Sequence, residues 1–198
     1  LDMGYNAGDL EYREWPWPIR VIFLAALLVT ACNLIGSVAR RHTEDIYLSN
    51  WYTIGGVLWT CIIAIVAILP WYQHGLGQVS VSGYYMHNAV GMWFTPLALG
   101  IFYYAIPKLL SRPIYSYALG VFAFWTNLVF YPIIGAHHFL FSPLPWWLQT
   151  TAIVFSVAML VPVWGGSANF LLTMRGRLGD MAHSYPLMFL FVGVVGYL

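Results

Sequence analysis

Long apolar stretches separated by short polar segments dominate the chain from about residue 17 onward. A helix needs about 20 mostly apolar residues to cross the hydrocarbon of a bilayer. Five stretches meet that length, and a sixth begins near Tyr185 and is cut short by the last residue; the five are roughly 17–38, 50–72, 80–109, 116–141 and 146–173. The pattern predicts an all-α, polytopic transmembrane helix bundle with five complete spans and a truncated sixth.

Composition agrees with a membrane protein. Of the 198 residues, 61% are hydrophobic and 8% are charged, a balance typical of integral membrane proteins. The net charge is +1, with the basic residues in short clusters between apolar stretches, so no nucleic-acid partner is expected. The chain begins without a methionine and ends inside an apolar stretch. We therefore expect residues 1–198 to form a single membrane domain that is an internal piece of a longer polypeptide.

The basic residues predict how the spans are oriented. They follow the first, third and fifth spans as the pairs Arg40 and Arg41, Lys108 and Arg112, and Arg175 and Arg177. The loops on the opposite side, 71–78 and 142–147, contain no lysine or arginine. By the positive-inside rule, the three basic loops are expected to be cytoplasmic.

Three histidines lie inside the predicted spans. His87 is in the third span, and the adjacent His137 and His138 are in the fourth. Because the two spans run in opposite directions, and each histidine lies a similar distance from the outer end of its span, all three are expected at one depth. Ionisable side chains inside membrane spans are rare and costly, and mark functional sites by default. The shared depth predicts a metal bound by all three, although a single histidine near an interface is often only a satisfied polar residue.

The surrounding residues bear on which metal binds and how. Neighbours on a regular helix point about 100° apart, so His137 and His138 reach one ion only if the helix is distorted. Pro132 and Gly135 predict such a distortion just before the pair. Imidazole suits copper, zinc, iron and nickel. With no thiolate or carboxylate in reach and no HExxH motif, copper is favoured over zinc.

Other polar groups on these spans suggest proton chemistry. Tyr131 stands two helical turns before His138 and so shares its face; it is a candidate donor of a proton and an electron to the metal, or else a packed aromatic residue. Hydroxyl and amide groups could also form a hydrogen-bonded proton route from the cytoplasm, although such groups also simply join helices; they are Ser116, Tyr117, Thr126, Asn127 and Thr95.

Several segments resemble one family. They are GYYMHNAVGMWFT, YYAIPK, RPIYSY, FYPIIGAHHFLFSPLPWWLQT and VFSVAMLVPVWGGSANFLLTMRG, with EYREWPWPI and HTEDIYLSNW flanking the first span. Together they resemble subunit I of the haem-copper oxygen reductases, specifically of the cbb3-type cytochrome c oxidases, over nearly the whole chain. A tyrosine six residues before the histidine pair, with none four residues after His87, favours the cbb3 type.

The resemblance implies a function. His87, His137 and His138 would bind the copper called CuB, opposite a high-spin haem, within a larger twelve-helix-type catalytic subunit. Tyr131 would be covalently linked to His87 and would supply a proton and an electron. The reaction implied is four-electron reduction of O₂ to water with electrons from cytochrome c and protons from the cytoplasm. The partners implied are c-type cytochrome subunits in the bacterial inner membrane.

The resemblance also sets limits. The axial ligands of the high-spin and low-spin b-type haems would lie on spans outside this chain, so the segment alone is expected to be inactive. Tyr117, and with less support Thr95, match positions associated with the single proton channel of this type. Gly120 and Ala123 depart from the pattern, standing where the family has serine and histidine.

Two alternatives compete with an oxidase. Nitric oxide reductases of the same superfamily bind non-haem iron with an added glutamate, but the turn after His87 carries Val90 and Gly91 instead. A non-enzymatic metal or ion transporter whose histidines bind transiently would show neither a Tyr131 link nor a haem spectrum.

Overall fold

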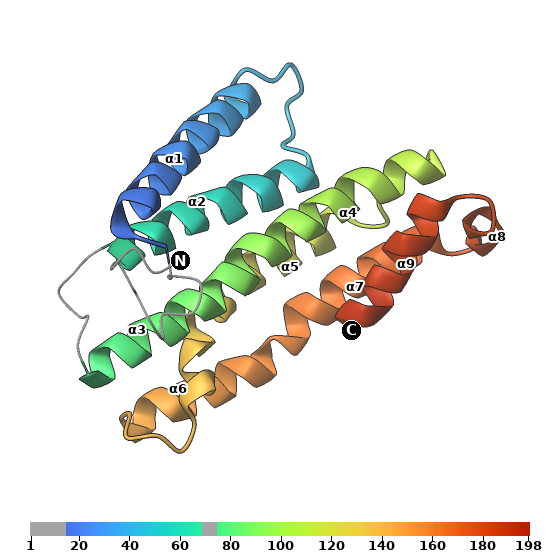
Figure 1. The fold of residues 1–198 in the computed structure, drawn as a ribbon. Helices are drawn as coiled ribbons and strands as arrows, with labels where there is room; N and C mark the ends of the chain where they lie inside the picture. Colours follow the sequence, from blue (N-terminus) through green and yellow to red (C-terminus); the bar gives the residue numbers. More distant parts are fainter. Residues whose placement is uncertain (1–14, 69–74) are drawn as a thin grey trace.

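The computed structural model describes residues 15–68 and 75–198, and these fold almost entirely as helices with no strand (Figure 1). The predicted all-α bundle is confirmed. The helices in chain order are α1 (Trp17–Ala39), α2 (Leu48–Ile68), α3 (Gly75–Asn88), the π-helical η1 (Ala89–Phe94), α4 (Thr95–Leu110), α5 (Tyr117–Phe130), the 3₁₀-helical η2 (Tyr131–Phe139), α6 (Trp146–Ala158), α7 (Leu160–Met174), α8 (Leu178–Met181) and α9 (Tyr185–Tyr197).

Continuous helices form five spans long and apolar enough to cross a membrane, within the described residues. Most boundaries fall within two residues of those expected. The third span begins at Gly75 rather than near residue 80 and runs 36 residues to Leu110, so His87 lies deeper along its helix than the sequence suggested. The expected end of the second span, residues 69–72, lies outside the described residues. The sixth apolar helix, α9, has 13 residues.

Two spans change helical geometry partway along. The fourth passes from α5 into η2 at Tyr131, next to Pro132, which confirms the distortion expected before the histidine pair. Proline removes a helical hydrogen bond, and that loosens the turn around it. The third span widens into η1 directly before Pro96, and the N–H of Thr95 reaches back to the carbonyl of Val90. This π-helical turn was not predicted.

The core lies where α2, α4, α5, α7 and α9 meet. Its largest side chains, Tyr52, Tyr103 and Phe170, are almost fully buried. α1 packs on α2 at one edge of the bundle and α9 packs on α7 at the other (Figure 1). Many large apolar side chains face outward, Ile22 and Phe122 among them. An apolar outer surface is what a helix bundle presents to lipid.

The loops that carry the basic clusters meet at one end of the bundle. The Arg112 guanidinium donates a hydrogen bond from Nη1 to the carbonyl of Arg175 at 3.0 Å, which joins the loops after α4 and α7. The Tyr117 hydroxyl donates to the carbonyl of Ile46 at 2.7 Å, which joins the start of α5 to the loop after α1. The spans therefore alternate in direction, as the charge pattern predicts.

Candidate metal centre

Three histidine side chains converge near the junction of α3 and η2. His87 is the penultimate residue of α3, and His137 and His138 lie near the end of η2. One ring nitrogen from each lies within 4.8 Å of the others. The Nδ1 atom of His87 is 3.1 Å from His137 Nε2 and 3.2 Å from His138 Nε2. The residues that the sequence placed at one depth do come together.

Hydrogen bonding alone does not explain this convergence. The Nε2 atom of His87 lies 3.0 Å from the backbone carbonyl of Tyr131; a carbonyl only accepts, so this nitrogen carries the hydrogen. A neutral imidazole then has a single lone pair, on Nδ1. That lone pair faces two other ring nitrogens, of which it can fully satisfy one. A cation at the centre would use one lone pair from each ring.

The spacing also fits a metal ion. Imidazole nitrogens bind first-row ions such as zinc at about 2.0 Å, so two of them separated by a bond angle of about 100° lie about 3.1 Å apart. The closest nitrogen pairs here, at 3.1 and 3.2 Å, agree with that value. Three neutral imidazoles without thiolate or carboxylate are a donor set that copper accepts. The residues present therefore fit copper.

One serine outside the cluster contacts the His137 ring and orients it. The Nδ1 atom of His137 lies 3.1 Å from the hydroxyl oxygen of Ser156, on α6. A metal-bound histidine almost always uses its second ring nitrogen in a hydrogen bond, which fixes the ring and its tautomer. Ser156 does this for His137, as the Tyr131 carbonyl does for His87. The His137 ring is thereby left with Nε2 aimed at the centre.

Tyr131 lies against the cluster. Its ring stacks on that of His87, with centroids 4.1 Å apart and planes inclined by 14°. Gly91 makes room for it, because a Cβ atom at residue 91 would fall on the Tyr131 ring. The turn η1, which carries Gly91, thus provides the surface on which Tyr131 rests.

The cluster is closed on one side and open on the other. His87 is only 3% exposed, whereas the His138 side chain is exposed. The open side leads to a cleft of about 510 Å³ lined by His137, His138, Leu140, Ile153, Ser156 and Val157. A reactant or a planar cofactor has room to approach the histidines from this side.

The family described as Cytochrome C and Quinol oxidase polypeptide I matches residues 1–198. The chain belongs to this family. The sequence-based resemblance to subunit I of the cbb3-type haem-copper oxidases is thereby confirmed, since the relatives include one of that type.

Three curated bacterial relatives are similar along essentially the whole chain. The cbb3-type cytochrome c oxidase subunit CcoN1 of Stutzerimonas stutzeri is 32% identical over 206 residues, covering 100% of this chain and 43% of the relative. A cytochrome c oxidase subunit 1 homolog of Agrobacterium tumefaciens is 31% identical, and the cytochrome c oxidase subunit 1 of Rhodobacter capsulatus is 29% identical; each match covers 98% of this chain and 38% of the relative. The chain thus spans about two-fifths of the length of these relatives.

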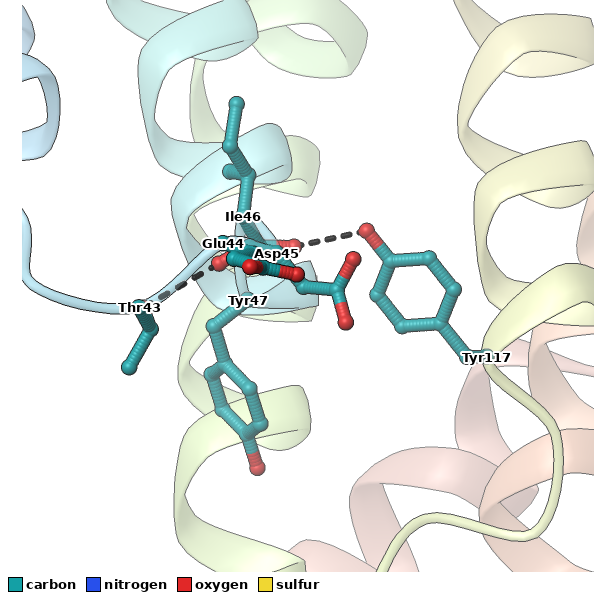
Figure 2. Close-up of a pocket in the computed structure, with 6 residues that line it drawn as sticks. All are labelled: Thr43, Glu44, Asp45, Ile46, Tyr47 and Tyr117. Carbon is teal, nitrogen blue, oxygen red and sulfur yellow. Dashed lines mark hydrogen bonds between the residues drawn. The ribbon is translucent and has the colours of Figure 1, made fainter.

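Tyr117, a predicted proton-route residue, lies at the end of the bundle that carries the basic loops. Its hydroxyl accepts a hydrogen bond from Trp51 Nε1 at 3.1 Å while donating to the Ile46 carbonyl. It lines an open pocket with Glu44, Asp45 and the neighbouring residues Thr43, Ile46 and Tyr47 (Figure 2). The pocket gives Tyr117 access to water at this end.

Most of the other predicted proton-route residues form hydrogen bonds within their own spans. The hydroxyls of Thr95 and Thr126 donate to backbone carbonyls of their own spans, and Ser116 caps the first turn of α5 by accepting from the N–H of Leu119. Asn127 is buried, and its Oδ1 atom has no hydrogen-bond partner. These contacts do not link the residues into one chain of hydrogen bonds, so their role in proton transfer stays a prediction.

Sequence reasoning missed Ser156 and the role of Gly91. Ser156 lies 19 residues from His137 on a different helix, and only the folded arrangement brings them together. Gly91 lies four residues after His87, a spacing that signals a shared helical face. That signal was available in the sequence, but the need for a glycine depends on where the Tyr131 ring lies.

Proposed function

We propose that this chain is the copper-binding segment of the catalytic subunit of a terminal respiratory oxidase, which reduces O₂ to water with electrons from cytochrome c. The observation that carries the proposal is the cluster of three imidazole nitrogens, 3.1–3.2 Å apart at its closest pairs, with a tyrosine ring stacked on it. Membership in the cytochrome c and quinol oxidase family supports the same assignment.

In this proposal His87, His137 and His138 hold the copper ion CuB. Copper so bound would supply a centre that exchanges single electrons beside a high-spin haem. The protein's own contribution is to keep two of the rings fixed: Ser156 occupies the outer nitrogen of His137, and the Tyr131 carbonyl that of His87. A preorganised set of ligands reduces the reorganisation needed at each electron transfer. The exposed side of His138 and its cleft would face the haem.

Tyr131 is the proposed source of one proton and one electron for breaking the O–O bond. Its ring already contacts a proposed copper ligand. The covalent His87–Tyr131 link implied by the resemblance would form a bond between a ring nitrogen of His87 and a ring carbon of Tyr131 while an N–H and a C–H bond break; the two electrons and two protons released would go to O₂, the oxidant that the proposed function supplies. Such a link would hold the phenol next to the reacting oxygen, and it would be visible as a joined peptide lighter by two hydrogen atoms.

The proposal extends to partners and topology. c-type cytochrome subunits would deliver electrons, and b-type haems would be held by axial ligands from parts of the protein outside this chain. The bacterial inner membrane is the proposed location, because the five long helices are apolar and the relatives named above are bacterial oxidase subunits. The end bearing the basic loops and Tyr117 would face the cytoplasm and take up protons.

Metal analysis combined with CO-difference spectroscopy of the purified, complete protein tests this function. We expect one copper per catalytic subunit and a haem–CO band that is photodissociable. Iron in place of copper would instead indicate a nitric oxide reductase. The absence of any haem spectrum would overturn the proposal in favour of a metal or ion transporter.

Replacing His137 tests the ligand assignment. The His137→Ala variant is expected to lose its copper and at least about 100-fold of its oxygen-reducing rate, because two imidazoles cannot complete the site. The spectrum of the low-spin haem should remain. His42→Ala, in an exposed loop, is the matched control and should retain both copper and activity. If His137→Ala consumes oxygen at the wild-type rate, the ligand assignment is wrong.

A further inference from the structure

Two aromatic rings besides that of Tyr131 fit against glycines where α3 meets η2. A Cβ atom at Gly83, on α3, would overlap the ring of Phe139, on η2. A Cβ atom at Gly135, on η2, would overlap the ring of Tyr84, on α3. Each of the two elements therefore inserts a ring into a space that a glycine leaves on the other.

Two glycines flank His87 along the third span. Gly83 lies four residues before His87 and Gly91 lies four residues after it, which is about one helical turn in each direction. The rings that contact these two positions are those of Phe139 and Tyr131. His87 is therefore held between two ring contacts, and both rings belong to η2, which carries the other two histidines.

These contacts oppose sliding of the third span along η2. Packed elements can shift past each other by about one turn. Such a shift would bring the His87 side chain to the place that Gly83 or Gly91 now occupies. A ring of η2 already fills each of these places, and side chains in a close-packed interior cannot share space. The rings therefore allow the register in which His87 faces the histidine pair and block the neighbouring ones.

Tyr84 links the surroundings of both histidine-bearing segments. Its backbone carbonyl accepts a hydrogen bond from the side-chain amide of Asn88, the residue after His87, at 2.8 Å. Its ring lies against Gly135, two residues before His137. A displaced Tyr84 would therefore disturb both sides of the cluster.

We propose that Tyr84 and Phe139 are positioning residues of the metal centre. Together with Tyr131 they fix the register of the third span against η2, and so hold the three histidines close together before a metal binds. The consequence for copper rests on the proposed function: a site assembled in advance binds its metal without having to order the ligands. Both residues act through the backbone that carries the histidines.

Hydrogen exchange in copper-depleted protein tests the register without any metal. The complete protein, purified with its accompanying subunits and treated with a copper chelator, is compared with its Gly83→Ala and Gly135→Ala variants. Each added methyl group displaces a ring, so we expect the backbone amides of η2 to exchange at least about tenfold faster. Gly166→Ala is the matched control, because Gly166 is also a buried glycine but a Cβ atom there meets nothing within 4 Å; its η2 amides should exchange as in the wild type.

Rescue by a smaller side chain separates a positioning role from general damage to the fold. The atoms of Phe139 that a Cβ atom at residue 83 would overlap are the outer ring atoms Cε2 and Cζ, whereas Cδ2 would lie 3.3 Å away. Leucine lacks the outer atoms, so Phe139→Leu makes room for the methyl group of Gly83→Ala. In competition with a chromophoric chelator, Gly83→Ala should lose at least about tenfold in copper affinity, and the double variant should regain most of it.

A mismatched pair is the control for this rescue. Residue 135 faces the ring of Tyr84, so adding Phe139→Leu to Gly135→Ala should restore nothing. Phe139→Leu alone removes a ring contact without a clash, and should raise the exchange rate of the η2 amides less than Gly83→Ala does.

Wild-type exchange and wild-type copper affinity in both alanine variants would overturn the positioning role. So would an equal loss of affinity in Gly83→Ala with and without Phe139→Leu. A wild-type protein that binds no copper and shows no haem–CO band would instead defeat the proposed oxidase function. The exchange measurement would then still decide whether the rings hold η2, because it needs no copper.

Discussion

A glycine, Gly91, allows the Tyr131 ring to come close to the histidines. η1 places Gly91 against the Tyr131 ring, and a Cβ atom there would overlap the ring atoms. The ring can stack on His87 at a centroid distance of 4.1 Å only because residue 91 ends at its Cα atom. The glycine is therefore needed for close approach, and its backbone has no unusual dihedral angle to accommodate.

We predict that Gly91→Ala displaces Tyr131 without removing the metal ligands. The added methyl group should push the ring away from His87, and with it the proposed proton and electron donor. Loss of a positioned proton donor costs about 100-fold or more in rate. Oxygen consumption should fall by that order, and mass spectrometry should find no joined His87–Tyr131 peptide. Copper content should stay at the wild-type level.

Gly36→Ala is the matched control for this change. Gly36 lies in α1, and a Cβ atom there meets nothing within 4 Å. Its activity should equal that of the wild type, with a small gain in helix stability because alanine is the better helix former. Full activity in Gly91→Ala would show that the position of Tyr131 against His87 has no part in turnover.

Residue type and spacing were enough to find the three histidines that converge, and not enough to find what supports them. His87, His137 and His138 could be predicted because imidazoles are rare in lipid and because alternating spans set their depth. Ser156 could not be predicted as the partner of His137. Serines are common in such helices, and only the packing of α6 on η2 selects this one.

At the scale of elements, hydropathy predicted the spans but only partly their irregularities. Pro132 and Gly135 correctly indicated a distorted turn before the histidine pair, now seen as η2. The π-helical η1 could not be predicted, because a proline such as Pro96 is also tolerated within a regular membrane helix. In η1 the backbone hydrogen bonding shifts by one residue to a wider turn, as in the bond from the N–H of Thr95 to the carbonyl of Val90.

One side chain of α7 ties the start of α5 into the bundle. Asn169 accepts a hydrogen bond from the backbone N–H of Ser116 at 2.9 Å and donates to the carbonyl of the same residue at 2.8 Å. It is fully buried and also reaches Tyr103 on α4. A single amide thus joins three helices near the end that carries the basic loops.

We predict that Asn169→Leu destabilises the bundle by about 1–2 kcal/mol. The change takes from the part-buried N–H group of Ser116 its partner Asn169, and hydrogen bonds between membrane helices are worth about 0.6 kcal/mol each on average. Thermal unfolding in detergent, followed by tryptophan fluorescence, should show a lower midpoint. Thr126→Val removes a hydroxyl that bonds only within its own helix, and should shift the midpoint far less. Equal shifts in the two variants would contradict the joining role of Asn169.

At the scale of the whole molecule, the two ends differ in charge. The loops after α1, α4 and α7 carry five arginines, with Lys108 in the last turn of α4, and contacts such as Arg112 to Arg175 join them. Arg20, near the start of α1, lies toward the other end and bonds the carbonyl of Ala67. The opposite loop, between η2 and α6, has no basic residue and exposes Phe141 almost completely. If the basic loops are retained in the cytoplasm, the orientation of every span in the membrane follows, since consecutive spans alternate in direction. The metal centre would then lie nearer the outer surface.

We predict that single cysteines at the two ends react from opposite sides of the membrane. A membrane-impermeant maleimide applied to intact spheroplasts should label Phe141→Cys and leave His42→Cys unlabelled; inside-out vesicles should reverse the result. The native Cys32 and Cys61 lie within α1 and α2, where the reagent does not reach them, so the unsubstituted protein serves as the control. Labelling of His42→Cys from outside would contradict this orientation and show that the basic loops face outward. Proton uptake through the Tyr117 pocket would then start from the outer surface, which the proposed oxidase cannot use to draw protons from the cytoplasm.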